Sequence, residues 1–77
     1  MERHPVILSI AGSDCSGGAG IQADIKTISA LGGYAASAIT AITIQNTLGV
    51  RAVQSIAPDI VRGQIEAVMD DLQPVAI

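Results

Sequence analysis

A glycine-rich stretch at residues 11–24 lies between a short apolar run and a segment with helical periodicity, and this order restricts the fold more than any other feature. The apolar run, at residues 6–10, reads as a buried strand. A buried strand that leads through a glycine-rich loop into a helix is typical of parallel α/β proteins, where such loops bind small ligands. Glycines in the loop let a ligand approach the backbone closely, because they lack a Cβ atom.

The spacing of apolar residues predicts alternating strands and helices along the chain. Ile21, Ile25 and Ile28, for example, share one face of a helix that ends at the glycine pair at 32–33. The expected elements are a buried strand at 6–11, a helix at 19–31, a buried strand at 34–44, a weaker edge strand at 50–56, a helix from 58 to the stop at 73–74, and the opening of another buried strand at 75–77. This alternation predicts a doubly wound parallel α/β fold.

The chain has 77 residues, of which 49% are hydrophobic, and these values allow at most one small domain. Tyr34 is its only aromatic residue, so isoleucine, valine, leucine and alanine must form the core. A doubly wound sheet normally contains more strands and helices than this chain supplies. We therefore expect residues 1–77 to be the N-terminal portion of a single larger domain, cut inside a strand.

Charge and composition disfavour several classes of partner. The net charge is −3 and the four cationic side chains are scattered, which disfavours binding to nucleic acid. One cysteine cannot form an internal disulfide, and no apolar stretch approaches about 18 residues, which disfavours a membrane span. No metal-ligand spacing occurs in the sequence. These features predict a cytoplasmic protein.

Two nucleotide-binding motifs are matched only in part. Residues 18–23 fit the dinucleotide pattern G-x-G-x-x-A, but they begin too far behind the strand, and no acid follows the second strand. The glycines at 12 and 17 have the spacing of a P-loop, yet Gly18 and Ala19 occupy the positions of its lysine and hydroxyl residue. The sequence therefore disfavours a dinucleotide-binding site and excludes a P-loop.

Asp24 and Gln45 are the polar residues that the pattern singles out. Asp24 falls on the apolar face of its helix, either as an acid favoured by the helix dipole or as a group that faces a polar ligand cavity. Gln45 follows the second strand, either as a turn residue or as a donor and acceptor for a nitrogen heterocycle. Cys15 reads as a spectator thiol, and His4 receives no role.

The runs IAGSD at 10–14, SGGAGIQADIKT at 16–27, AITAIT at 38–43 and QNT at 45–47 closely resemble the N-terminal part of the hydroxymethylpyrimidine/phosphomethylpyrimidine kinases. These are thiamine-biosynthesis enzymes of the ribokinase-like superfamily. The resemblance implies a three-layer α/β sandwich with a mostly parallel sheet. It also implies ATP-dependent phosphorylation, with Mg²⁺, of 4-amino-5-hydroxymethyl-2-methylpyrimidine and then of its monophosphate.

At the positions that match the family's motifs, the resemblance implies that Gln45, Gly12 and Asp24 bind the substrate. It places no catalytic residue, no metal ligand and no ATP-binding residue in this chain, so we expect the chain alone to be inactive. We expect the whole enzyme to be a homo-oligomer. Two alternatives stay open: a pyridoxal or pyridoxine kinase type of vitamin kinase, and a non-catalytic small-molecule binding module.

Overall fold

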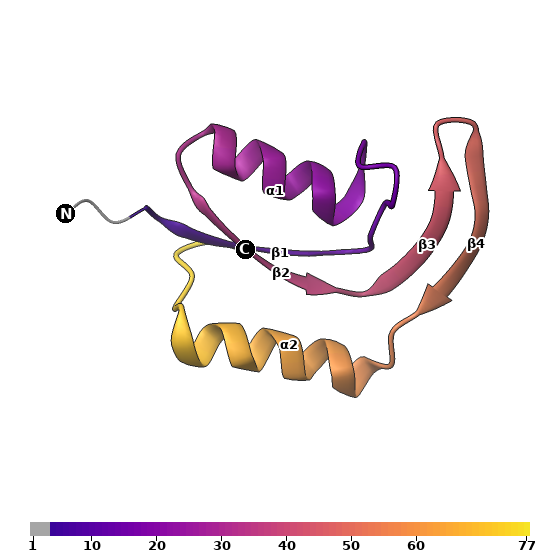
Figure 1. The fold of residues 1–77 in the computed structure, drawn as a ribbon. Helices are drawn as coiled ribbons and strands as arrows, with labels where there is room; N and C mark the ends of the chain where they lie inside the picture. The colour runs from indigo at the N-terminus through magenta and orange to yellow at the C-terminus, as the bar shows by residue number, and fades with distance from the viewer. Residues whose placement is uncertain (1–3) are drawn as a thin grey trace.

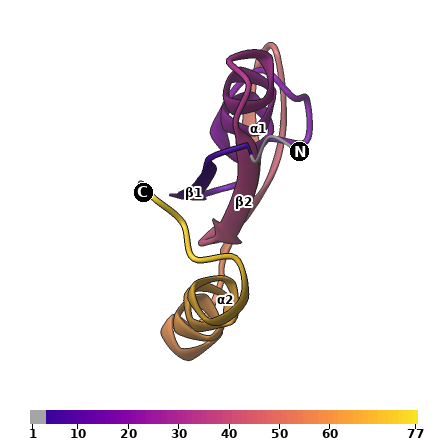
Figure 2. The same ribbon diagram turned by 90° about the vertical axis from the view of Figure 1, so that its left-hand side faces the viewer.

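The computed structural model describes residues 4–77, and four of its elements stack in three layers (Figure 1). Strands β1 and β2 form the middle layer, with α1 on one face and α2 on the other. The perpendicular view shows the same order of layers (Figure 2). The elements are β1 (Val6–Ala11), α1 (Gly20–Ala30), β2 (Tyr34–Ile39), β3 (Ala41–Asn46), β4 (Gly49–Ser55) and α2 (Pro58–Asp71).

β1 and β2 are parallel, and α1 provides the connection between them. Their register runs from Val6 opposite Tyr34 to Ala11 opposite Ile39. Parallel neighbours need such a crossover, and the helix packs its apolar face on the sheet. Because the two strands end together, their carboxyl ends lie at one edge of the sheet. The expected strand–helix–strand unit is therefore confirmed.

The core lies between the middle layer and α2. Leu8 is fully buried, and Ala36 and Ala38 are buried beside it. Because the alanine side chains on β2 are small, α2 can pack closely on this face of the sheet. The partly buried residues that pack against this cluster come mainly from one face of α2 and include Val6, Ile65, Val68 and Leu72. Ile21 is the buried residue of α1 on the other face of the sheet.

Both helices begin and end close to the predicted positions. α1 begins one residue after the expected start and ends one residue before the expected end. α2 begins with Pro58, a residue that suits the first helical turn because its nitrogen needs no hydrogen-bond partner there. Asp59 in the same turn adds a favourable interaction with the helix dipole.

The single strand expected at 34–44 is wrong, because the structure divides it at Thr40. The N–H of Thr40 still donates to the carbonyl of Ala11 (3.0 Å), which is the last bond in line with the parallel sheet. Beyond Ala11, β1 gives way to the glycine-rich loop, so β2 has no further partner in that direction. The chain then turns and continues as β3.

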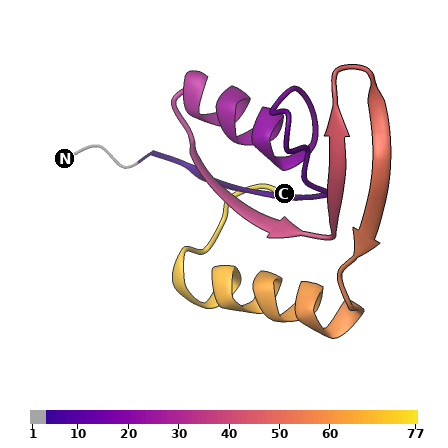
Figure 3. The ribbon, with the colours of Figure 1, turned by 45° about the vertical axis from the view of Figure 1, so that its right-hand side comes forward.

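The weaker strand expected at 50–56 is present as β4, but it pairs with β3 in an antiparallel hairpin, which the predicted doubly wound parallel fold did not specify. The side chain of Asn46 accepts a hydrogen bond from the N–H of Leu48 (2.9 Å) and stabilises the turn. A register shift between Ile44 and Gln45 marks a bulge, and Arg51 is the extra residue of β4. The hairpin stands at the end of the layered body, beside the loop that leads into α1, as Figure 3 shows.

Residues 75–77 lie along the edge of β1 that β2 leaves free. Ala76 forms a parallel bridge with Ile7, its carbonyl accepts from the N–H of Leu8 (3.0 Å), and the N–H of Val75 donates to Val6 (2.9 Å). The pairing agrees with the expected start of a strand, although Val75 and Ile77 are exposed rather than buried. Neither α1 nor α2 has the length and apolar character that crossing a membrane requires.

Candidate functional site

The glycine-rich loop between β1 and α1 lies at the carboxyl edge of the sheet, where parallel α/β proteins bind ligands. Its path is fixed by a close approach between the two ends of the loop. The N–H of Ile21 donates to the carbonyl of Gly12 (2.8 Å). Gly20 has φ +58°, and a Cβ atom at this position would collide with the Gly12 carbonyl. Only glycine at position 20 therefore permits this loop.

The carboxylate of Asp14, a buried residue, organises the centre of the loop. Its Oδ1 accepts hydrogen bonds from the hydroxyl (2.6 Å) and the N–H (2.9 Å) of Ser16. Its Oδ2 accepts from the N–H of Gly18 (3.1 Å). The hydrogen bond from the Ser16 side chain is the main cause that holds the pKa of Asp14 below its usual value of 3.8.

These bonds determine what the loop can bind. A phosphate cradle needs backbone N–H groups that point outward without partners. In this loop the N–H groups of Ser16 and Gly18 already donate to a negatively charged group of the chain itself. Asp14 and Ser16 therefore stabilise the loop itself, and these two N–H groups are not free to bind a phosphate.

The first half of the loop is attached to β3. The N–H of Ser13 donates to the carbonyl of Ala41 (2.9 Å), and the hydroxyl of Thr43 donates to the carbonyl of Ser13. One step further, the Cys15 thiol donates to the carbonyl of Gln45 (3.0 Å), and the N–H of Gln45 donates to the same sulfur (3.4 Å). Cys15, which received no role from the sequence, thus helps to fix the backbone at Gln45.

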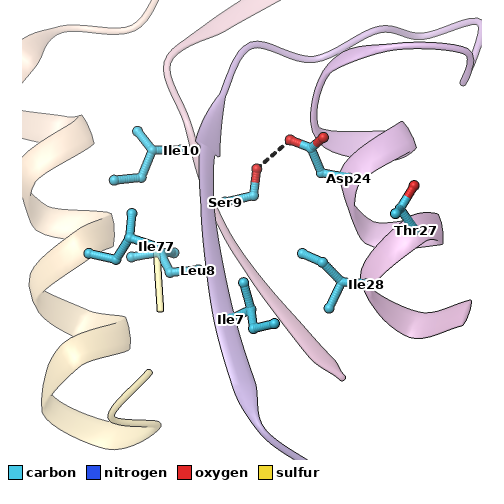
Figure 4. Close-up of a pocket in the computed structure, with 8 residues that line it drawn as sticks. All are labelled: Ile7, Leu8, Ser9, Ile10, Asp24, Thr27, Ile28 and Ile77. Atoms are coloured by element: carbon cyan, nitrogen blue, oxygen red, sulfur yellow. Dashed lines mark hydrogen bonds between the residues drawn. The ribbon is translucent and has the colours of Figure 1, made fainter. Parts of the chain in front are cut away.

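Asp24 lies on α1 at the rim of a cavity between α1 and the free edge of β1 (Figure 4). The cavity has a volume of about 400 Å³. Its polar groups are Ser9, Asp24 and Thr27, and the rest of its wall is apolar: Ile7, Leu8, Ile10, Ile28 and Ile77. The hydroxyl of Ser9 donates to Oδ2 of Asp24 at 2.6 Å. Asp24 is half-buried and lies beyond the first turn of α1, where it lines this mostly apolar cavity beside β1. Its part in ligand binding stays a prediction.

Gln45 lies on the opposite side of the loop, on the hairpin. It is half-buried, and its partner across the hairpin is Val50, so the two side chains share one face. The bulge next to Gln45 sets this pairing. β-bulges often redirect a side chain beside a functional site.

The three predicted substrate-binding residues lie around the same loop but do not line one cavity. Gly12 occupies the middle position, since its carbonyl contacts α1 and its Cα faces Ala41 at the start of β3. Asp24 lines the cavity beside β1, whereas neither Gly12 nor Gln45 does. Ser9 could not be identified from the sequence as a partner for Asp24, because these residues are 15 positions apart.

The resemblance implies ATP and Mg²⁺ and places the residues that bind them outside this chain. Within residues 4–77, no group of three or more histidine, cysteine, aspartate or glutamate side chains comes together to hold a metal ion. Two N–H groups of the loop, those of Ser16 and Gly18, are occupied by the Asp14 carboxylate.

Comparison with known proteins finds a family model and curated relatives that carry the same description. The model of the family described as "Phosphomethylpyrimidine kinase" matches residues 14–77. The chain is 61% identical over 72 residues to a hydroxymethylpyrimidine/phosphomethylpyrimidine kinase of Rhizobium meliloti, a match that covers 94% of this chain and 27% of that protein. It spans about a quarter of the length of the curated relatives that it matches.

Solved structures of two kinases superpose on the chain. A phosphomethylpyrimidine kinase from Clostridium difficile gives a TM-score of 0.84 at 60% identity, covering 91% of this chain and 32% of that one. A pyridoxal kinase from Staphylococcus aureus gives a TM-score of 0.80 at 37% identity, covering 90% of this chain and 26% of that one.

Proposed function

Because this chain belongs to the phosphomethylpyrimidine kinase family, we propose that it is part of an enzyme that phosphorylates a hydroxymethylpyrimidine with ATP. In a second step, the enzyme phosphorylates the resulting monophosphate. The observation that carries the proposal is the high sequence identity to relatives that bear this name, which extends over nearly the whole chain. Residues 1–77 form the N-terminal part of one kinase domain, and the short pairing of Ala76 with Ile7 supports a sheet that continues there.

In this proposal the chain contributes part of the pyrimidine pocket. The amide of Gln45 offers both a donor and an acceptor, which complement an amino group beside a ring nitrogen. The carboxylate of Asp24 accepts a hydrogen bond from an amino group, and the absence of a side chain at Gly12 lets the ring approach the backbone. The position of all three residues around the loop at the carboxyl edge of the sheet supports this assignment.

The phosphoryl transfer itself uses groups outside the described residues. The oxygen of the hydroxymethyl group forms a bond to the γ-phosphorus, the bond from that phosphorus to the bridging oxygen breaks, and ADP leaves. The hydroxyl proton passes to a base. In this proposal the base and the phosphate-binding groups belong to the rest of the domain, so we propose that the 77-residue chain alone forms no phosphorylated product.

The test uses a chimera in which this chain replaces the segment that it matches in the Rhizobium meliloti relative. We expect the chimera to phosphorylate the hydroxymethylpyrimidine. Gln45→Leu leaves the polar edge of the ring unpaired, at a cost of about 1–3 kcal/mol, so KM for the pyrimidine rises while KM for ATP stays constant. Steady-state kinetics with each substrate varied in turn measures both constants.

Gln54→Leu is the matched control, because Gln54 pairs with Ile42 on the other face of the same hairpin. We expect its KM for the pyrimidine to equal that of the unmodified chimera. If Gln45→Leu binds the pyrimidine as well as the unmodified chimera does, measured by calorimetry, Gln45 does not belong to the site.

A pyridoxal kinase is the second candidate, because the Staphylococcus aureus pyridoxal kinase superposes on the chain. The lower identity to that protein favours the pyrimidine. Assaying the chimera with pyridoxal and the pyrimidine in parallel separates the two candidates by their kcat/KM values. Binding without turnover of either substrate would instead favour the non-catalytic module.

A further inference from the structure

The hydrogen bond from Ser9 to Asp24 joins two layers of the molecule at the rim of the cavity beside β1. Ser9 lies on β1 and Asp24 on α1, and the 2.6 Å distance between hydroxyl and carboxylate oxygens is typical of a charge-assisted hydrogen bond. In Figure 4 the Ser9 side chain points toward α1, on the side of β1 opposite to Leu8 and Ile10. The contact is therefore directed at the helix and not at the core.

Ser9 is the one polar residue in the strand sequence VILSIA. A hydroxyl in such a strand costs free energy unless it has a hydrogen-bond partner. Its partner in the structure is Oδ2 of Asp24. Among the hydrogen bonds of the described residues none involves Oδ1 of Asp24, so one carboxylate oxygen is held by the strand and the other is available to a ligand.

We propose that Ser9 is a positioning residue for recognition of the pyrimidine. Its hydroxyl fixes the Asp24 carboxylate so that Oδ1 accepts a hydrogen bond from the amino group of the ring. The inference rests on the proposed function. It adds a residue that touches no substrate itself and acts through Asp24.

The chimera described above provides the test. Replacing Ser9 with alanine removes a hydrogen bond to a charged group, and we expect KM for the pyrimidine to rise about 10-fold while KM for ATP stays constant. Ser37→Ala is the matched control. Ser37 is the register partner of Ser9 on β2, so this variant removes a hydroxyl at the same level of the sheet without breaking the bond to Asp24.

A second pair of variants separates positioning from folding. Ser9→Thr keeps the hydroxyl and Ser9→Val removes it at nearly the same volume, and both residues suit a strand. We expect threonine to preserve KM for the pyrimidine and valine to raise it as alanine does, with equal thermal unfolding midpoints for the two variants. Equal KM values for threonine and valine would overturn the proposal.

The decisive measurement is the effect of Ser9→Ala in an Asp24→Ala background, in which no side chain at position 24 can accept from the Ser9 hydroxyl. If Ser9 acts through Asp24, the second substitution adds no further rise in KM for the pyrimidine. The same fold-change in both backgrounds would overturn the positioning role. These outcomes are distinct from failure of the proposed function, since an unmodified chimera that phosphorylates neither pyrimidine nor its monophosphate would refute that function whatever Ser9 does.

Discussion

The layered body formed by β1, β2, α1 and α2 buries apolar side chains, whereas the β3–β4 hairpin leaves its own exposed. Among residues 4–77, the buried apolar residues all lie in the body: Leu8, Ile21, Ala36 and Ala38. In the hairpin, Ile44 is 57% exposed and Val53 is 59% exposed. Both regions are rich in β-branched residues, so apolar character alone does not decide burial. The covering helices make the difference, because the body has one on each face and the hairpin has none (Figure 1).

The two regions are also held in place by different forces. Burial of apolar surface stabilises the packing of α2 on the sheet. The hairpin is instead attached to the body through hydrogen bonds from the loop, at Ser13 with Ala41 and at Cys15 with Gln45. Its position relative to the loop, and therefore the position of Gln45, depends on polar contacts.

The largest effect that this comparison predicts concerns the 77-residue chain on its own. Its exposed apolar side chains and unpaired strand edges favour association. We expect the purified chain to be molten, aggregated or oligomeric, as measured by size-exclusion chromatography with light scattering. A monodisperse monomer with a cooperative thermal transition would contradict this expectation.

The contribution of the hairpin to that association can be isolated. Ile42 and Ile44 lie on one face of β3, and replacing both with lysine places two charges on that face. We expect this variant to form smaller species than the unmodified chain. Replacing Ile60 and Met69, which are exposed apolar residues of α2, with lysine is the control. Equal effects of the two pairs would remove the hairpin as the source of association.

The next prediction compares two leucines, one in the layered body and one in the hairpin. Leu8 in the body is fully buried, and Leu48 at the tip of the hairpin is 94% exposed. In the chimera, Leu8→Ala should lower the free energy of unfolding by about 2–5 kcal/mol, because it leaves a cavity in the core. Leu48→Ala should change it by less than about 0.5 kcal/mol, as an exposed substitution does. Urea unfolding measures the free energy of unfolding of both variants. Equal losses of this free energy would contradict the difference between body and hairpin.

The body was predictable from the sequence because its signals are local. Apolar spacing located β1, α1 and α2 to within a residue or two, and Pro58 marked the start of the second helix. The likeness to solved kinases confirms the three-layer α/β fold of the ribokinase-like superfamily that the resemblance implied. These features depend on neighbours within a few residues of one another.

The hairpin was not predictable from the same signals. Residues 34–44 form one continuous run of strand-forming residues, and its division at Thr40 depends on where β1 ends, far away in the sequence. The turn at Thr47 and Leu48 lacks the Asn-Gly pair that identifies most two-residue hairpins. Asn46 and Gly49 flank that turn and were the signal that could have revealed it.

The candidate site was predictable to the same limited extent. Asp24 and Gln45 stood out because each is a polar residue at an apolar position or at the end of a strand. Their contacts did not stand out, because Ser9 is 15 positions from Asp24 and Cys15 is 30 positions from Gln45. Only the fold brings these partners together.

The smallest predicted effect lies in the loop that joins the two regions and concerns its pH dependence. The pKa of Asp14 is lowered in the folded chain, mainly by the hydrogen bond from the Ser16 side chain. The ionised carboxylate therefore stabilises the fold at pH values above the usual pKa of 3.8. This contribution is lost as the pH falls through the lower pKa of the folded state, when the carboxylate takes up a proton.

Asp14→Asn tests this sign in the chimera. Asparagine has one acceptor oxygen and cannot accept hydrogen bonds at both of the positions that Oδ1 and Oδ2 occupy, so the variant should unfold at a lower temperature near neutral pH. The gap between the two midpoints should shrink as the pH falls below 3.8, because protonation removes the advantage of the carboxylate. Asp71→Asn, at the end of α2, controls for the change in net charge. A gap that stays constant from neutral pH to pH values below 3.8 would show that the charge of Asp14 does not stabilise the loop.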